Sequence, residues 1–527
     1  MNPKHPRPDY VIQFAKPKNT EIKYINGKWY LYERHFSYDP QTKKTKKVSG
    51  KILGSITEYG FIPRKVPHAA IADIEVVELG ASLYFTTRTQ TLKKRLQASF
   101  PELWREIYVA AVLRVIYGNA FRRIGLHYET SFLSKIYPGL ALSPGSITAL
   151  LKRIGKDRRA IRQFMESFTT EKQRFILIDG HRILSASRSL DHAQIGYDSK
   201  CRYQPQVNLL YLFSLDEHAA YPQYYKQYLG SVPDVSAFSD IISESGIKGS
   251  MVTVVADKGF GSEENFELID GSGMNYIIPL RRGNTEVKGK VPASQAAYPH
   301  AFLYHGRSVF CMTYEREGYH VHLYLDTSLL YAETNDLISR LQKQNQTTEC
   351  RKEKELMRRS KQRGRLFDEQ LAALVPRSVS DVVADKNEMG TISIKTHRRD
   401  LNAQQVYAIY KQRQAIEQFF KTYDCILGYD ASYMRDTYSF EAWLFFNHLC
   451  SMMSFDALEE IASAGEENNI SLHDLIQTLR KVKANKIGDI WHPAKITTKT
   501  LALCQKMGIK LEDFTNLSAL LHPHPKT

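Results

Sequence analysis

Two short apolar runs in this chain each lead into an aspartate. Residues 251 to 260 read MVTVVADKGF, in which a run typical of a buried β-strand meets Asp257. Residues 174 to 181 read RFILIDGH, in which a similar run meets Asp179. Aspartate near glycine is a common turn former, so one such motif alone predicts a turn more often than a functional site. Two of them together predict a pair of carboxylates at one edge of a sheet.

The pattern around these motifs predicts an α/β fold. Strand-like runs fill much of residues 174 to 215, and a helix is expected near residues 235 to 246. After the strand that ends at Asp257, Ser262 is a helix cap, and residues 275 to 280, NYIIPL, read as another strand. Strands that alternate with helices predict a mixed sheet with helical crossovers.

The first half of the chain predicts a small sheet followed by helices. Asn26-Gly27 is a hairpin signal within residues 21 to 39, which alternate and are rich in aromatics. Residues 88 to 128 have apolar positions at helical spacing. Residues 142 to 166 predict one helix with a basic polar face. Such a face suits a DNA-reading helix, although basic surface helices without that role are more common.

A composition shift marks residues 283 to 395 as an insertion. Residues 283 to about 330 read as successive strands with many aromatics, and residues 332 to 375 read as a highly charged helix. Both signs mix in that helix, which is typical of a solvated face. The insertion is therefore expected to be a separate unit that the sheet does not need for folding.

Residues 402 to 424 predict one strong helix. At about 100° per residue, an arc of roughly 80° holds a phenol, a guanidinium, a carboxylate, an ammonium and a second carboxylate. These groups belong to Tyr410, Arg413, Glu417, Lys421 and Asp424. Ordinary ion pairs between residues four apart also explain such a face, and are common.

Charge and composition favour a polyanionic partner inside the cell. The chain has 527 residues, 43% of them hydrophobic, with a net charge of +16 and an isoelectric point of about 9.3. Its first 60 residues hold 12 Lys plus Arg and 5 Asp plus Glu, which indicates a contact surface for nucleic acid. The six cysteines form no CxxC pair, no run is long enough to cross a membrane and no signal peptide is recognisable. We therefore expect free thiols and a soluble, intracellular protein.

Together, the carboxylates change the interpretation of the helix. Two strand-end aspartates and a helix glutamate among basic groups are what a two-metal phosphoryl-transfer site requires. Hard cations such as Mg²⁺ prefer oxygen ligands, and two of them stabilise the attacking and leaving oxygens of an in-line displacement.

These residues resemble the DDE transposases of bacterial insertion sequences, most closely the insertion-sequence-four superfamily. In that superfamily the second aspartate lies in an ADRGF-like motif, matched here by ADKGF at Asp257, and the first follows an apolar strand, as Asp179 does. The family signature Tyr-x2-Arg-x3-Glu-x6-Lys matches at Tyr410, Arg413 and Glu417. The last position is Asp424 instead of Lys, and Lys421, one turn earlier, is the expected substitute.

The resemblance implies the fold and the site. The fold would be α/β: an RNase H-like (retroviral-integrase-like) core interrupted by a β-rich insertion, with an N-terminal β-hairpin and helical DNA-binding region and a helical C-terminus. Asp179, Asp257 and Glu417 would be catalytic and would hold Mg²⁺ or Mn²⁺, two ions in all, while Tyr410, Arg413 and Lys421 would contact DNA. The expected boundaries are, in order, 1–87 (basic, β-rich, DNA-binding), 88–170 (helical, DNA-binding), 171–282 (core), 283–395 (insertion), 396–455 (core with the Glu helix) and 456–527 (helical).

The implied activity is DNA transposition. Water would cut a phosphodiester at the element end, and the freed 3′-hydroxyl would attack target DNA, so Tyr410 is expected to position DNA rather than act as a nucleophile. The partners would be double-stranded DNA, in the form of terminal inverted repeats and target, and a second copy of the chain in the DNA complex. The expected location is the bacterial cytoplasm, at the nucleoid, with no membrane. Two alternatives remain open: an RNase H-like nuclease that cuts without joining, and a non-catalytic DNA-binding protein derived from a transposase.

Overall fold

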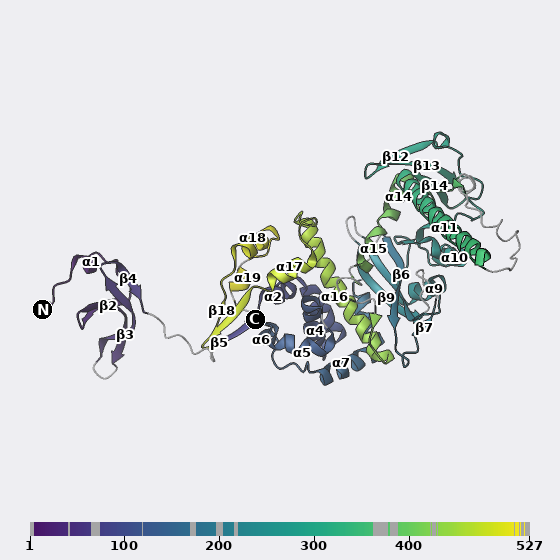
Figure 1. The fold of residues 1–527 in the computed structure, drawn as a ribbon. Coiled ribbons are helices and arrows are strands. Elements are labelled where there is room, and N and C mark those ends of the chain that lie inside the picture. Colours follow the sequence, from purple (N-terminus) through teal and green to yellow (C-terminus); the bar gives the residue numbers. More distant parts are fainter. Residues whose placement is uncertain are drawn as a thin grey trace. The chain divides into compact units, whose positions relative to one another are not determined.

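A computed structural model of the chain gives the fold (Figure 1). It describes residues 5–39, 43–64, 74–118, 120–168, 175–196, 204–215, 220–361, 378–379, 388–421, 423, 428, 431–510, 512–515, 517 and 521. The chain divides into two compact units. The smaller comprises Met1–Glu75 with Lys486–Ile490, and the larger Val76–Asn485 with Trp491–Thr527.

The smaller unit is built on a four-stranded antiparallel sheet of order β1-β2-β3-β4. Its elements are α1 (Asp9–Ile12), β1 (Thr20–Ile25), β2 (Lys28–Asp39), β3 (Lys44–Thr57) and β4 (Gly60–Pro63). The predicted hairpin at Asn26-Gly27 is confirmed, since both residues have the positive φ, 48° and 81°, that a tight two-residue turn needs. A small apolar cluster of Val11, Trp29, Leu31 and Ile56 holds this sheet together.

The larger unit begins with helices, as the apolar spacing predicts. They are α2 (Gly80–Arg88), α3 (Gln90–Ser99), α4 (Trp104–Tyr117), η2 (Phe121–Arg123), α5 (Ile124–Glu129), α6 (Leu133–Ile136), α7 (Pro144–Lys156) and α8 (Arg158–Glu166). The single helix expected over residues 142 to 166 is two helices. Ser143 caps the first, and Asp157 ends it and caps the second by accepting a bond from the Ala160 N–H at 3.0 Å.

An eleven-stranded mixed sheet forms the centre of the larger unit. Its main path runs β12-β13-β14-β15-β11-β10-β6-β8-β7, with β9 paired to β8 and β16 to β6. The strands are β6 (Phe175–Ser185), β7 (Gln194–Ile195), β8 (Pro205–Leu215), β9 (Ala220–Leu229), β10 (Thr253–Ala256), β11 (Asn275–Leu280), β12 (His300–Tyr304), β13 (Arg307–Glu315), β14 (His320–Asp326), β15 (Thr391–Thr396) and β16 (Ala431–Ser432). The expected crossover helices are present as α9 (Asp234–Ser245) and α10 (Glu263–Gly271), which Ser262 caps. Strand β6 is one continuous strand.

The insertion is not separate from this sheet, contrary to the expectation from composition. Strand β14 pairs with β15, and β15 pairs with β11, both antiparallel, so strands on both sides of the expected boundary at residue 282 share hydrogen bonds. The strand character of residues 300 to 326 is confirmed. The long charged helix α11 (Thr327–Lys361) follows β14 directly, and residues 362 to 377 lie outside the described part.

The strong helix expected over residues 402 to 424 is broken. Helix α14 (Ala403–Lys411) is capped by Asn402, and α15 (Gln414–Lys421) begins after a turn at Gln412 and Arg413. The N–H of Arg413 bonds to the Tyr410 carbonyl at 3.1 Å, and the N–H of Ile416 to the Arg413 carbonyl at 2.9 Å. Because these bonds span three residues instead of four, the uniform 100° rotation does not continue through the turn.

The C-terminal region, expected to be helical, consists of two short strands and helices around one long apolar helix. This is α16 (Thr437–Ser463), which contacts α4, α7 and β9. The remaining elements are α17 (Leu472–Leu479), β17 (Lys483–Ile487), β18 (Ile490–Pro493), α18 (Thr498–Lys506) and α19 (Glu512–Thr515), and β5 (Ile74–Glu78) joins the sheet β18-β17-β5. Over the part of the chain that the structure describes, every helix is too short or too polar to span a membrane.

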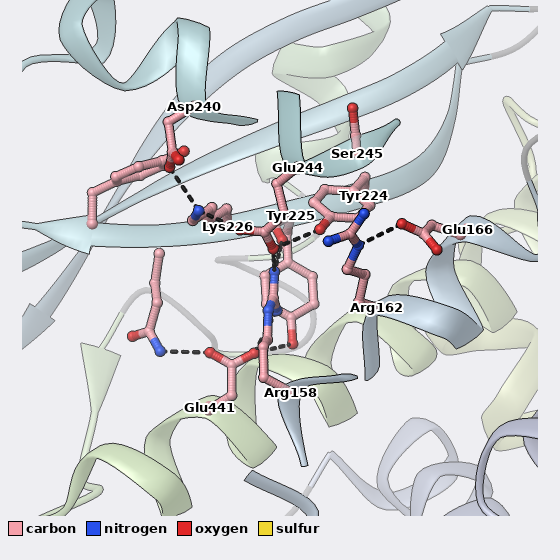
Figure 2. Close-up of polar contacts among 12 residues, drawn as sticks. Arg158, Arg162, Glu166, Tyr224, Tyr225, Lys226, Asp240, Glu244, Ser245 and Glu441 are labelled. Carbon is pink, nitrogen blue, oxygen red and sulfur yellow. Dashed lines mark hydrogen bonds and ion pairs between the residues drawn. The ribbon is translucent and has the colours of Figure 1, made fainter. Parts of the chain in front are cut away.

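A network of charged side chains fastens these helices to the sheet (Figure 2). Arg158, at the start of α8, bonds to Glu441 of α16 at 2.6 Å and to Glu244 of α9 at 3.0 Å. It also donates to the Tyr225 carbonyl of β9 at 2.9 Å. Tyr224 donates to Glu244 at 2.6 Å. Each charged group of this network therefore has partners, as burial requires. Through the Arg158 guanidinium, α8 is joined to α9, α16 and β9.

Candidate active site

The pairing of β10 with β6 brings the two aspartates together. The strands are parallel, with Ala256 opposite Ile178, so the next residues, Asp257 and Asp179, lie at the same level. Asp257 follows the last residue of its strand, as predicted. Asp179 does not: β6 continues to Ser185, and Asp179 pairs with Tyr211 of β8 in mid-strand. The two carboxylates thus meet where the parallel part of the sheet ends.

Gly180 is needed for close packing and not for a turn. A Cβ at this position would lie 2.5 Å from a carboxylate oxygen of Asp234, the first residue of α9. Asp234 is held there by Asn208 at 2.7 Å and Arg182 at 3.1 Å. The turn interpretation of Asp-Gly is therefore wrong here, since the glycine lets α9 approach the strand.

One guanidinium lies within ion-pair distance of all three predicted carboxylates. Arg413 Nη1 is 3.2 Å from Asp179 Oδ2, and Arg413 Nη2 is 3.9 Å from Asp257 Oδ1 and 3.7 Å from Glu417 Oε1. Arg413 is in the turn between α14 and α15, which lets its side chain reach the sheet while Glu417 comes from the next turn of helix. The structure thus brings together Asp179, Asp257, Arg413 and Glu417, residues spread over 239 positions of sequence.

Burial and charge set the protonation of this site. Burial raises the pKa of Asp179 to about 6, with a smaller contribution from the nearby charges of Asp257 and Asp234, while Arg413 and the Gly180 N–H act to lower it. Burial also raises the pKa of Tyr410, which hydrogen bonds with Arg413. Tyr410 is therefore a neutral hydroxyl at pH 7, suited to hydrogen bonding.

The donor set suits a hard divalent cation. The three carboxylates supply only oxygen, which Mg²⁺ and Mn²⁺ prefer. As the side chains stand, no group of three or more His, Cys, Asp or Glu among the described residues is arranged to hold a metal ion. The Arg413 guanidinium supplies the positive charge between the carboxylates.

Two of the predicted site positions lie partly or wholly outside the described residues. Lys421 is the last residue of α15, but its side chain lies outside the described part, and so does Asp424. Sequence reasoning also missed two residues that contact the site or its helix. Asp234 follows Pro233 as the first residue of α9, where an acidic side chain is common, and gave no other signal. Lys411, in the last turn of α14, lies 3.6 Å from Asp326 of β14.

Comparison with known proteins agrees with this geometry. The transposase DDE domain family matches residues 170–453, which is more than half of the chain. The chain belongs to this family. The match begins just before β6 and ends within α16, so it contains Asp179, Asp257 and Glu417.

Other similarities are distant. The chain is similar to a solved structure described as a piggyBac transposase synaptic complex with hairpin DNA, at 11% identity and a TM-score of 0.35, over 76% of this chain and 78% of that one. None of the curated proteins matches the chain in sequence.

Proposed function

We propose that this transposase-family chain binds the ends of an insertion sequence and catalyses metal-dependent strand cleavage and strand transfer. The observation that carries the proposal is the convergence of Asp179, Asp257 and Glu417 on one guanidinium. A turn former has no reason to meet two other carboxylates from distant parts of the chain. Assignment to the insertion-sequence-four superfamily remains part of this proposal.

The strand order supports an RNase H-like core. Strands β9, β8 and β6 are antiparallel neighbours, and β6, β10 and β11 are parallel neighbours, which gives the order β9-β8-β6-β10-β11. Three antiparallel strands followed in space by two parallel ones fit the fold implied by the carboxylate motifs. The core would then be interrupted after β11 and resume at α14, consistent with the proposed boundaries. Strand β15 is the exception, because all but its last residue lies within the proposed insertion and yet it pairs with β11.

The residues of the site have separable roles in this proposal. Asp179, Asp257 and Glu417 would hold Mg²⁺ or Mn²⁺, which when bound activates the attacking oxygen and stabilises the leaving one. Arg413, once its carboxylate partners are neutralised, is free to hold a DNA phosphate through its planar fork of donors. Tyr410, neutral and adjacent, orients that phosphate or the guanidinium, and Lys421 is proposed as a further DNA contact.

The basic N-terminal unit is proposed to bind DNA together with the helices that follow, and two copies of the chain are proposed in the DNA complex. A nuclease that cuts without joining uses the same carboxylates. It is distinguished by products, because only a transposase joins the cut end to a second DNA. Nothing in the described structure favours a non-catalytic DNA-binding protein over either enzyme, since all three carboxylates lie within 4 Å of one guanidinium.

Substitution of Asp257 by Asn tests the proposal. Asparagine suits turns as well as aspartate does but is a poor ligand for Mg²⁺, so Asp257→Asn should reduce cleavage and joining of element-end DNA by at least ~100-fold. The same loss is expected for Asp179→Asn and Glu417→Gln. Binding of the DNA, measured by gel shift in Mg²⁺, should change by less than about threefold, because phosphate contacts elsewhere carry most affinity.

Asp270→Asn is a matched control. It removes a carboxylate from α10, where Asp270 pairs with His397 at 3.1 Å, away from the three site carboxylates. This variant should cleave like the parent. Near-parental cleavage by Asp257→Asn would mean that the carboxylates are structural, and cutting without strand transfer by the parent would favour the nuclease.

A further inference from the structure

The outer half of the β2–β3 hairpin stands clear of its sheet. Strand β1 pairs with β2 only as far as Glu33, and β4 pairs with β3 only over Gly54–Thr57. Beyond these limits β2 and β3 pair with each other alone, through six cross-strand pairs from Arg34↔Ser49 to Asp39↔Lys44. We call residues 34–39 and 44–49 the ribbon.

The ribbon is exposed on both faces. The described side chains of residues 35–38 and 44–49 are all exposed, in contrast to the buried Trp29 and Leu31 at the base of the same hairpin. Register shifts on either side of Tyr32 mark an irregularity at the base, where a bulge increases the twist of a strand pair. The ribbon therefore makes no contribution to the apolar cluster of this unit.

Its composition is unusual for an exposed hairpin. The ribbon holds three lysines, Lys44, Lys46 and Lys47, and one arginine against one aspartate. Two large aromatics are also exposed, Phe36 at 58% and Tyr38 at 61%. Lysine on an exposed strand pair protects against aggregation, but that need does not explain exposed aromatics beside it.

The two faces differ. Directly opposed residues of an antiparallel pair share a face, so Phe36 lies with Lys47, and Ser37 lies with Lys46. Arg34 and Tyr38 share the face of Phe36, and the Arg34 guanidinium lies 5.2 Å from the Phe36 ring centroid. One face is thus aromatic and cationic, while lysines are present on both.

We propose that the ribbon enters the major groove of double-stranded DNA. Six residues per strand span about 20 Å, and two strands with their side chains fit a groove about 12 Å wide that is known to admit a two-stranded β-ribbon. The aromatic face lies against base edges, where rings contact thymine methyl groups, and the lysines reach the phosphates on both walls. A second copy of the ribbon does not fit this surface, because two such cationic surfaces repel each other. The inference rests on the proposed DNA-binding function and names the surface that makes the contact.

The test measures binding of the full chain to a mixed-sequence 30-base-pair DNA duplex across a series of salt concentrations. Lys46→Thr with Lys47→Thr should weaken binding about 10- to 100-fold near 0.1 M salt and reduce the slope of log affinity against log salt by about 2. Phe36→Ser with Tyr38→Ser should weaken binding about 3- to 30-fold and leave that slope unchanged. Both variants should keep the parental melting temperature, since the ribbon is outside the apolar cluster.

Further measurements separate a specific effect of the ribbon lysines from a general loss of charge, and separate binding in the major groove from binding elsewhere on the duplex. Lys499→Ala with Lys510→Ala removes two exposed lysines from the C-terminal region and should change affinity by less than threefold. A duplex RNA of the same sequence has a major groove too deep and narrow for a ribbon, so neither ribbon variant should change its binding. Methylation of guanine N7, a major-groove atom, should interfere with binding of the parent and not of the aromatic variant.

The outcomes separate this inference from the proposed function. Ribbon variants that bind the DNA duplex like the parent would overturn the inference while leaving transposition intact. A change of oligomeric state in the variants would mean that a second copy covers the ribbon, and would overturn it too. Loss of DNA binding in the variants, combined with a parent that binds but never cuts, would support the ribbon and remove the proposed function.

Discussion

At the scale of single residues, Arg413 sets the charge of the site. It is the cation that lies within 4 Å of all three carboxylates, at 3.2, 3.9 and 3.7 Å. Without Arg413, the negative charges of Asp179 and Asp257 would repel each other in a half-buried position with less positive charge to offset them, which is unfavourable. If these carboxylates hold divalent metal as proposed, the metal and Arg413 would compete for them.

Arg413→Gln should lower the stability of the metal-free protein and increase its response to metal. The loss leaves like charges uncompensated, so we expect a destabilisation of about 1–3 kcal/mol. Mn²⁺ should then raise the melting temperature more than it does in the parent, because it binds without displacing a guanidinium. Cleavage should still fall, since the proposed phosphate contact is lost. Differential scanning fluorimetry with and without Mn²⁺ measures the first two effects.

Arg159→Gln is the control, because Arg159 is exposed on α8 and away from the carboxylates. It should leave both melting temperatures unchanged. An equal Mn²⁺ response in Arg413→Gln and the parent would show that the guanidinium does not compete with metal.

The sequence points to the residues that the structure brings together, but it does not predict how they are arranged. Asp179, Asp257 and Glu417 could be found because apolar strands and a helical signature flank them. The central place of Arg413 could not, because it depends on a turn between α14 and α15. Residues 411 to 414 contain no Gly or Pro, so local sequence gave no sign of that turn.

At the scale of elements, Asp326 fastens the insertion to the helix that carries the site. This fully buried residue ends β14 and accepts a hydrogen bond from Tyr407 of α14 at 2.5 Å. It also accepts from the Ser328 N–H at 3.0 Å, at the start of α11. Arg307 and Lys411 lie 3.7 and 3.6 Å from its carboxylate. These contacts hold the pKa of Asp326 below its usual value, against the effect of burial.

Asp326→Asn should therefore destabilise the protein and misplace the site. Asparagine has the shape of aspartate but no negative charge, so the charges of Arg307 and Lys411 lose this carboxylate partner. We therefore expect the free energy of unfolding to fall by about 2–4 kcal/mol. Because α14 leads directly into the turn at Arg413, the rate of cleavage should fall while Glu417, Asp179 and Asp257 remain in the chain. Urea unfolding and a cleavage assay below the transition measure the two effects.

Asp400→Asn is the matched control, because Asp400 pairs with Arg398 at 2.7 Å on the surface, where such pairs contribute roughly 0–1 kcal/mol. If Asp326→Asn is no less stable than Asp400→Asn, the buried carboxylate does not fasten the insertion to α14.

The order of the strands could not be predicted, although most strands could. Apolar runs predict β6, β8, β10 and β11, but β9, which reads AYPQYYKQYL, alternates tyrosine with polar residues and was missed. The pairing of β15 with β11 joins residues more than 110 positions apart, and its pairing with β14 joins residues 66 to 76 positions apart. Composition placed residues 283 to 395 apart from the core because it reports side-chain chemistry and not hydrogen bonding between strands.

At the scale of the whole molecule, α16 links the helices to the sheet. Its 27 residues span about 40 Å, and its C-terminal half borders a cavity of about 720 Å³ lined by α2, β9 and α18. Asp456 of α16 lines that cavity. The pKa of Asp456 is raised to about 7, mainly by burial and in smaller part by the charges of Glu459 and Glu460, while a bond from Tyr221 acts to lower it. The other charged groups around the cavity are Arg88 and Lys506, with Arg95 close to Tyr221.

The Asp456 carboxyl makes the folded protein less stable as pH rises. The folded protein holds the Asp456 proton up to about pH 7, whereas the unfolded chain releases it near pH 4. Folding is thus favoured by this group below about pH 4, and that contribution is lost as pH rises to 7. Water in the cavity screens the charge, so the loss is expected to be about 1–2 kcal/mol, less than the shift alone implies.

Asp456→Asn removes the titration and should therefore gain about 1–2 kcal/mol over the parent at pH 8, with little difference at pH 4.5. Urea unfolding at several pH values gives the difference between the two proteins, in which the titration of all other groups cancels. Glu467→Gln, which removes an exposed carboxylate shortly after α16, should run parallel to the parent at every pH. A constant difference between Asp456→Asn and the parent from pH 4.5 to 8 would mean that Asp456 is ionised throughout, and that the cavity is more polar than its lining indicates.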